Sequence, residues 1–247
     1  MPDRIARHFD FLVEADRLKS VDRANVLMDL SRPENSAEHS WHVALQAMVF
    51  GASDRAIAML LLHDLVEIDT GDQPIHLAHD AAALALAEAG AAERIFGLSP
   101  DRDALIALWR EFEVGRTPDA VMAKRMDHSQ PLFQVLLAAQ PLADHVAIVR
   151  DNLNGGRAAR LAAEWPEALG WAEAALAGLP PAGNDLTRRL AFLAEADRLK
   201  TVLRANLLVD GSRRENSAEH SWHLALYALV FAGLAGPGVD AGRVIRM

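Results

Sequence analysis

Apolar residues recur three and four positions apart along most of this chain, which is the spacing of amphipathic α-helices. Ala and Leu dominate these segments, and no convincing stretch alternates between apolar and polar residues as a half-buried β-strand would. The pattern therefore predicts an all-α fold. Helices are expected at 3–18, 36–51, 54–68, 79–95, 101–114, 117–139, 142–152, 163–177, 187–199 and 217–234. The helix over 36–51 is expected to begin at an N-cap Ser36, with His39 at the position where a capping box carries Glu or Gln.

One segment of the chain is written almost twice. Residues 11–52 return as residues 192–233, with 30 of 42 positions identical at an offset of 181. The chain ends soon after the second copy, at Met247, and the Pro- and Gly-rich stretch around Pro180 separates the two parts. The sequence therefore predicts a complete domain over 1–178, a linker over 179–186, and a truncated second copy of its first helices over 187–247.

Composition narrows the possible function classes. With 51% hydrophobic residues, the 247-residue chain can bury a substantial core, and the absence of cysteine excludes thiolate nucleophiles and Cys-bound zinc. The apolar runs are too short for a membrane span. The absence of cysteine fits a reducing cytoplasm and the charged N-terminus is unlike a secretory signal, so we expect a cytoplasmic protein. A net charge of −9 argues against binding a nucleic-acid polymer, so an anionic ligand would need specific arginines or a metal ion.

The pair His63-Asp64 is the strongest chemical signal, because it lies within the apolar run AIAMLLLHDLV. A free carboxylate is costly to bury, and an imidazole and a carboxylate together are suitable ligands for a divalent transition metal. Glu67 follows one helical turn later, and Asp69 and Asp72 extend the acidic cluster. A further ligand could come from His39, with His42 as a competitor one turn on, and another from Asp127, which interrupts a later apolar face.

The blocks SRPENSAEHSWHVAL, LLLHDLVEIDTGD, ALWREFE and AKRMDHSQPL resemble the HD-domain superfamily of metal-dependent phosphohydrolases, in particular its small 5′-deoxynucleotidases. The resemblance covers about residues 5–178. It implies an all-α HD-domain helical bundle, one divalent metal (Mn, Co, Fe, Ni or Zn), and hydrolysis of a phosphomonoester, with a nucleoside 5′-monophosphate as the expected substrate. We also expect a homodimer.

The same resemblance assigns roles to individual residues. It implies a metal bound by His39, His63, Asp64 and Asp127. Glu67 and Asp72 match acidic residues beside the attacking water, and Arg23 corresponds to an arginine that binds the phosphate. Arg32 is a second candidate for a bidentate contact with phosphate, or else a surface residue that pairs with Glu34.

The sequence departs from the 5′-deoxynucleotidase pattern at two places. Ala24 follows Arg23, where those enzymes place Trp against the sugar, and His128 follows Asp127 in place of Arg or Lys. The first departure leaves the discrimination between deoxyribose and ribose open.

Two alternatives to a phosphomonoesterase with one metal stay open. His76 and His79, spaced i,i+3, could supply ligands for a second metal ion. Alternatively, the chain could bind a nucleotide or a metal without catalysis. The second copy lacks a His-Asp pair of its own, so it could pack on the outside of the domain, extend a dimer interface, or displace the first copy and place His220 on the metal.

Overall fold

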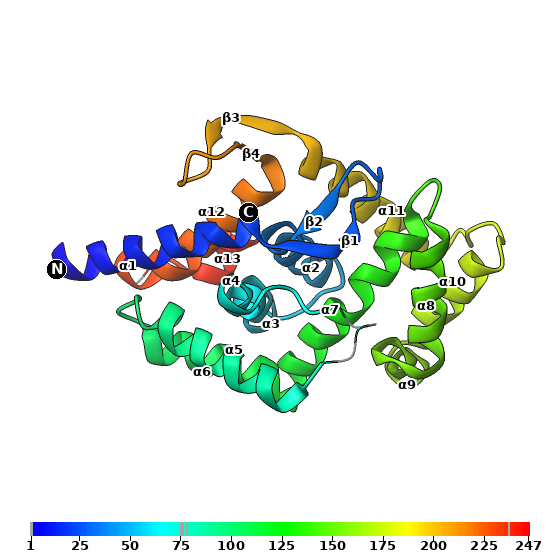
Figure 1. The fold of residues 1–247 in the computed structure, drawn as a ribbon, viewed down its shortest axis with the longest axis horizontal. Helices are drawn as coiled ribbons and strands as arrows, with labels where there is room; N and C mark the ends of the chain where they lie inside the picture. The colour runs from blue at the N-terminus through cyan, green and yellow to red at the C-terminus, as the bar shows by residue number, and fades with distance from the viewer. Residues whose placement is uncertain (1, 75–76, 78, 237) are drawn as a thin grey trace.

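The computed structural model describes residues 2–74, 77, 79–236 and 238–247. It confirms the predicted all-α fold, with two short hairpins added (Figure 1). The α-helices are α1 Pro2–Ala15, α2 Ser36–Val49, α3 Asp54–Leu62, α4 Glu67–Thr70, α5 Ala81–Phe96, α6 Arg102–Val114, α7 Pro118–Leu137, α8 Ala143–Gly155, α9 Leu161–Glu164, α10 Pro166–Leu176, α11 Asp185–Asp197, α12 Ser217–Phe231 and α13 Ala241–Ile245. The 3₁₀ helices are η1 Asp16–Ser20, η2 His63–Val66, η3 Arg157–Arg160, η4 Arg198–Thr201 and η5 Ala232–Leu234, and the strands are β1 Asp22–Val26, β2 Pro33–Asn35, β3 Leu203–Leu207 and β4 Arg214–Asn216.

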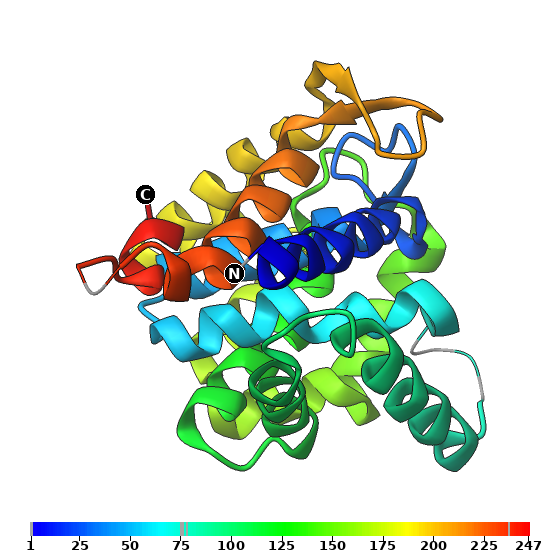
Figure 2. The same cartoon turned by 90° about the vertical axis from the view of Figure 1, so that its left-hand side faces the viewer.

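Helices α2, α3 and α7 form the centre of the fold and pack against one another. On one side lie α5 and α6, and on the other α1 lies beside α12, as Figure 2 shows in dark blue and orange. Helices α8 to α11 pack around the C-terminal half of α7. No helix in the described part of the chain is both long and apolar enough to cross a membrane.

The second copy of the repeat contributes to the hydrophobic core. Trp222 and Leu226 of α12 are fully buried among residues of α1, α2 and α3, and Leu190 of α11 is fully buried beside α7 and α10. Burying one such aliphatic side chain contributes roughly 1.5–3 kcal/mol. In addition, the Trp222 Nε1 group donates a hydrogen bond to the carbonyl of Leu61 at 3.1 Å, near the end of α3. The second copy is therefore an integral part of the folded core.

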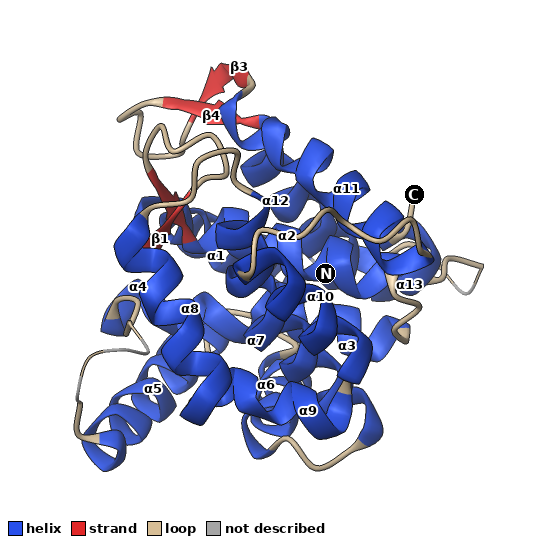
Figure 3. Ribbon diagram, turned by 90° about the vertical axis from the view of Figure 1, so that its right-hand side faces the viewer, coloured by secondary structure: helices blue, strands red, loops and turns tan. Residues whose placement is uncertain are grey.

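The structure contains four short strands that the sequence pattern did not reveal. Strand β1 pairs antiparallel with β2, and β3 pairs with β4, and both hairpins lie at the same end of the molecule (Figure 3). The paired strands are short, and the exposure of β1 does not alternate cleanly along the strand. Without such alternation, the sequence pattern contains no strand signal.

The predicted N-cap of the helix over 36–51 is also wrong, because Asn35 occupies that position and Ser36 is the first helical residue. The Asn35 side chain accepts a hydrogen bond from the Glu38 amide at 3.0 Å, and the Glu38 carboxylate accepts one from the Asn35 amide at 3.0 Å. This is a capping box, with Glu38 at N3 in place of His39. The one-residue shift follows from the extended backbone of Asn35 (φ −100°, ψ 162°).

Candidate metal centre

Four side chains from three separate parts of the fold converge at the centre of the bundle. His39 comes from α2, His63 and Asp64 from the 3₁₀ helix η2 that follows α3, and Asp127 from α7. Ligand atoms of His39, His63 and Asp64 all lie within 4.8 Å of one another. Asp127 Oδ1 lies 3.0 Å from His39 Nε2 and 3.5 Å from His63 Nε2. The predicted helix over 54–68 thus changes from α to 3₁₀ geometry at His63, where the two adjacent candidate ligands occur.

Both histidines present the Nε2 atom to the centre of this cluster. His63 Nδ1 lies 2.9 Å from the carbonyl of Leu60, which can only accept, so Nδ1 carries the proton. His39 Nδ1 lies 3.0 Å from Gln130 Oε1, an arrangement that fits the same tautomer. The buried His63 Nε2 makes no hydrogen bond of good geometry with any described residue. Two imidazole Nε2 atoms and two carboxylates facing a common point are a donor set that fits a divalent transition metal.

His42, the alternative to His39, lies behind the cluster. Its Nδ1 accepts from Gln130 Nε2 at 3.1 Å and from Lys200 Nζ at 2.9 Å. Burial and the charge of Lys200 hold the pKa of His42 well below its usual value. Of the two histidines, the structure brings only His39 beside His63.

Three further candidate residues lie directly beside the cluster. The Arg23 Nη1 atom lies 2.9 Å from Asp64 Oδ2, 3.5 Å from Glu67 Oε1 and 3.4 Å from Asp72 Oδ1. Glu67 also accepts a hydrogen bond from the Ser36 hydroxyl at 2.5 Å. Burial, followed by the charge of Asp64, raises the pKa of Glu67 to about 8. Three carboxyl groups, those of Asp64, Glu67 and Asp72, thus surround the single Arg23 guanidinium, and such an environment attracts a cation.

His39 experiences the same negative surroundings. Burial and the charge of Arg23 act to lower the pKa of His39, but its contacts with Asp127 and Glu34 raise it to about 9 overall. Asp69, the remaining acidic residue of the EIDTGD block, points elsewhere and pairs with Arg94 at 2.6 Å.

Arg32 is not part of this cluster. Its guanidinium donates to both carboxylate oxygens of Glu38, at 2.5 and 2.9 Å, and to the carbonyl of Lys200 at 2.8 Å. The expected surface partner was Glu34, so neither sequence interpretation of Arg32 describes its contacts. Because both terminal nitrogens of the Arg32 guanidinium already donate hydrogen bonds to protein groups, Arg32 is no longer a candidate for binding phosphate.

A cavity of about 960 Å³ opens above the cluster. Its walls include Arg23, Ala24, Asp127 and His128, which the sequence had singled out, and also Lys124 and Arg160, which it had not. Lys124 lies three residues before Asp127 on α7 and therefore on the same helix face. That spacing was the one available signal for Lys124.

The histidines proposed for a second metal ion are not both part of the described structure. His79 lines the cavity, and its Nδ1 lies 3.2 Å from the carbonyl of Leu77, whereas His76 lies outside the described residues. Within residues 2–74, 77, 79–236 and 238–247, the group formed by His39, His63 and Asp64 is the one set of three ligands close enough to share an ion.

Comparison with known proteins identifies the class of protein that this fold and cluster define. The HD domain family matches residues 15–169 and again residues 196–247, so the chain belongs to that family and the resemblance seen in the sequence is confirmed. The second match falls on the second copy of the repeat.

The most similar relatives include two 5′-deoxynucleotidases named HDDC2. The protein from Homo sapiens is 29% identical over 131 residues, which cover 50% of this chain and 64% of the human protein. The one from Xenopus laevis is 29% identical over 135 residues, covering 51% of this chain and 66% of that protein. The chain thus spans just under two thirds of the length of these curated relatives.

Among solved structures, the chain is similar to a predicted metal-dependent phosphohydrolase from Magnetospirillum magnetotacticum MS-1. The two are 36% identical with a TM-score of 0.58, and the match covers 72% of this chain and 100% of that one.

Proposed function

We propose that this protein is a divalent-metal-dependent phosphomonoesterase that acts on nucleoside 5′-monophosphates. The observation that carries the proposal is the convergence of two imidazole Nε2 atoms and two carboxylates at the floor of a large cavity, beside Glu67, Asp72 and Arg23. The relatives named as 5′-deoxynucleotidases and the solved structure named as a metal-dependent phosphohydrolase support the same reaction class.

In this proposal His39, His63, Asp64 and Asp127 hold one Mn, Co, Fe, Ni or Zn ion. Asp64, Glu67 and Asp72 surround the Arg23 guanidinium, and Asp127 faces His39 and His63, so an anionic substrate would be repelled without an added cation. A bound divalent ion supplies charge neutralisation for the phosphoryl group and lowers the pKa of water.

The neighbouring residues supply the remaining steps. Glu67, held by the Ser36 hydroxyl and by Arg23, is positioned to accept a proton from the attacking water, with Asp72 as the nearest alternative. The Arg23 guanidinium binds the phosphate oxygens once a cation balances Asp64. Lys124, on the same wall as Asp127, adds a second positive charge for the phosphate.

The size of the cavity fits a nucleotide better than a small phosphate ester, because pockets for molecules of nucleotide size typically measure roughly 300–1,000 Å³. Ala24 lines the wall beside Arg23, where the 5′-deoxynucleotidases carry Trp, so the sugar meets a smaller side chain. We therefore expect weak discrimination between deoxyribose and ribose.

The test is a panel of ribo- and deoxyribonucleoside 5′-monophosphates assayed with each of the five ions for release of inorganic phosphate. We expect activity that requires the ion and disappears with EDTA, with one metal ion per chain by elemental analysis. Nucleotide binding without phosphate release under any ion would instead support the non-catalytic module. Two ions per chain would support the two-metal alternative.

A substitution of Glu67 separates catalysis from metal binding in the same assay. Glu67→Gln should retain the bound ion and slow turnover by about 100-fold or more, because general-base catalysis typically contributes that much. Unchanged turnover would transfer the role of proton acceptor to Asp72.

A further inference from the structure

The two copies of the repeat contact each other through a reciprocal set of hydrogen bonds. Lys19 donates to Glu215 at 2.9 Å, and the equivalent Lys200 donates to Glu34 at 2.6 Å. Three further pairs of hydrogen bonds are related by the same offset of 181. Asn35 donates to Glu219 at 2.7 Å and Asn216 to Glu38 at 2.6 Å, and Arg32 donates to the Lys200 carbonyl at 2.8 Å and Arg213 to the Lys19 carbonyl at 2.6 Å. The Met28 amide donates to Asp197 at 3.2 Å and the Val209 amide to Asp16 at 2.8 Å.

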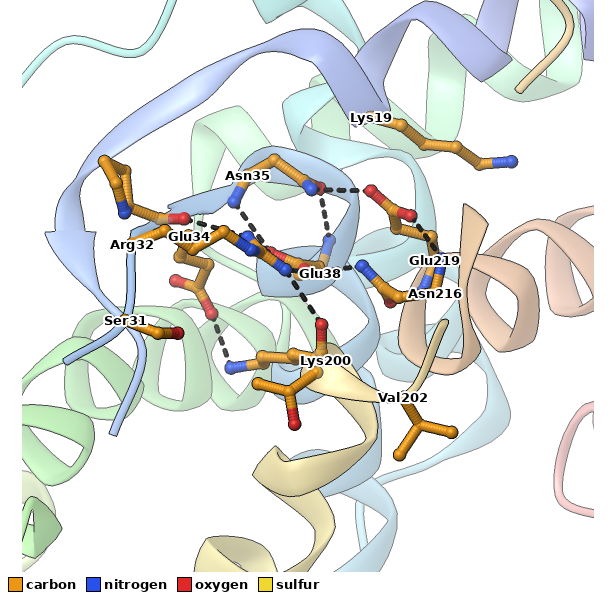
Figure 4. Close-up of polar contacts among 12 residues, drawn as sticks. Lys19, Ser31, Arg32, Glu34, Asn35, Glu38, Lys200, Val202, Asn216 and Glu219 are labelled. Atoms are coloured by element: carbon orange, nitrogen blue, oxygen red, sulfur yellow. Dashed lines mark hydrogen bonds and ion pairs between the residues drawn. The ribbon is translucent and has the colours of Figure 1, made fainter. Parts of the chain in front are cut away.

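Figure 4 shows the centre of this interface, where Asn35 and Asn216 reach across to Glu219 and Glu38 and Lys200 points at Glu34. An interface in which residue i contacts j and the copy of j contacts the copy of i is the kind formed by a symmetric dimer. Here one chain forms it alone. The second copy therefore covers the surface of the first copy that a symmetric dimer would use. The homodimer stays a prediction, and it would have to form through a different surface.

The reciprocal contacts differ in what lies behind them. Behind Glu34 lies His39, whose Nδ1 is 3.7 Å from Glu34 Oε2. Lys200 Nζ, fully buried, also donates to Gln134 Oε1 at 3.1 Å. Gln134 Oε1 accepts from Gln130 at 2.6 Å, and Gln130 Oε1 contacts His39 Nδ1 at 3.0 Å. Two short routes thus join the second copy to a candidate metal ligand.

On the other side of the interface, the equivalent route ends without a site. Lys19 binds Glu215, and Glu215 Oε2 lies 3.1 Å from His220 Nδ1. The His220 side chain is 33% exposed, and residues 234–247 contain no His-Asp pair. Lys19 and Lys200 therefore occupy matching buried positions, and only Lys200 is linked to the candidate metal centre.

We propose that Lys200, a residue of the second copy, is a positioning residue for His39 and completes the candidate metal centre from outside the first copy. The proposal rests on the metal centre of the proposed function. Lys200 holds Glu34, which lies beside His39 Nδ1, and it holds Gln134. Gln134 in turn holds Gln130, whose Oε1 contacts the same Nδ1 atom, so that Nε2 faces His63 and Asp127. Groups that orient a ligand histidine in this way contribute to metal affinity.

The test compares Lys200→Met with Lys19→Met in the full chain. Each change removes one buried ammonium from equivalent positions of the same interface, so the two have similar structural consequences. Metal affinity of the EDTA-stripped protein is measured by titration with Co²⁺, followed by visible absorbance. We expect Lys200→Met to weaken Co²⁺ binding by about 10–100-fold, the range for partners of ligand histidines, and Lys19→Met to change it less than about 2-fold.

Equal losses of Co²⁺ affinity in the two variants, or no loss in Lys200→Met, would overturn the proposal. If Lys200→Met does not fold, as circular dichroism would show, Glu34→Gln and Glu215→Gln replace the pair, because the amide keeps the shape of the carboxylate. Glu34→Gln should then weaken Co²⁺ binding, and Glu215→Gln should not. Equal effects in this pair would also contradict the proposal.

Combining Lys200→Met with Glu34→Gln tests the route. Because Lys200 acts on His39 partly through Glu34, the double variant should lose less Co²⁺ affinity than the product of the two single losses. Fully multiplied effects would show that Lys200 acts independently of Glu34 and would contradict the route. The Co²⁺ titration contains no substrate, so a chain that shows the expected affinities but releases no phosphate would overturn the proposed function and leave the role of Lys200 intact.

Discussion

Residues 11–52 and residues 192–233 adopt matching local structures, yet only the first segment contributes a candidate metal ligand, His39. Each copy has a 3₁₀ helix, a short hairpin and a helix that begins with an Asn–Glu capping box. The first copy is followed by the His63-Asp64 pair, whereas residues 234–247, which follow the second copy, contain no histidine. The comparison teaches that near-identical sequence sets local conformation, whereas the chemistry depends on what each copy packs against.

The equivalent side chains show how far their surroundings diverge. His39 is fully buried and lies 3.0 Å from Asp127, whereas His220 is one-third exposed and contacts Glu215. The Arg23 side chain is 14% exposed among three carboxylates, whereas the Arg204 side chain is 37% exposed and lies 3.5 Å from Glu215. Among the described residues, His220 and Arg204 have no neighbours equivalent to His63, Asp64 and Asp127.

The largest expected effect comes from a substitution in the His63-Asp64 pair, which follows the first copy. Asp64→Ala should lower metal affinity by more than about 100-fold, beyond the range for residues that merely orient ligands, and reduce phosphate release to background. Co²⁺ titration and the phosphate assay measure these losses, with circular dichroism as the control for folding. Full activity in a folded Asp64→Ala variant would refute the metal centre.

The equivalent arginines provide a more moderate test. Arg23→Ala removes charge-assisted hydrogen bonds to phosphate, each worth about 1.5–3 kcal/mol, so binding of inorganic phosphate to the Co²⁺-loaded protein should weaken about 10–100-fold. Arg204→Ala should change it less than about 2-fold, because Arg204 does not line the cavity. Isothermal titration calorimetry measures both. Similar effects of the two variants would remove Arg23 from the phosphate site.

The smallest expected effect concerns the hairpin turns, where the copies differ in sequence but share a backbone conformation. Leu30 has φ +62°, and its equivalent Gly211 has φ +72°. A Cβ added to Gly211 would meet no atom within 4 Å, so Gly211→Ala should destabilise through the backbone alone, by about 1 kcal/mol. Leu30→Gly should cost less, because it relieves the same strain in the first copy. Urea unfolding measures both, and a larger loss in Leu30→Gly would contradict the shared turn geometry.

Much of the fold was predictable because its helices follow the apolar spacing closely. For example, α7 covers 118–137 against a prediction of 117–139, and α5 covers 81–96 against 79–95. Strand β2, with only three residues, is too short to show a pattern. Asn35 and Ser36 are both good N-caps, but only Asn35 is followed three residues later by a Glu, so the capping-box pattern in the sequence favours Asn35 over the predicted Ser36.

The candidate site was predictable in part for a similar reason. His63-Asp64 and Asp127 interrupt apolar runs, and this local signal indicates that the side chains face inward. The contact of Arg32 with the Lys200 carbonyl depends on how the second copy docks, as does the ion pair between Lys200 and Glu34. Such pairings join residues 166 or more positions apart, and no local pattern in the sequence reports them.

The most direct test of the difference between the copies is the pair His39→Ala and His220→Ala, compared by Co²⁺ titration and by phosphate release. The structure places His39 beside His63 and Asp127 and leaves His220 at the surface beside Glu215. We predict that His39→Ala loses both metal binding and activity, and that His220→Ala keeps both within about 2-fold of the unsubstituted protein, because surface changes away from a site have small effects. The reverse result, loss in His220→Ala with His39→Ala unaffected, would show that the second copy has taken the place of the first.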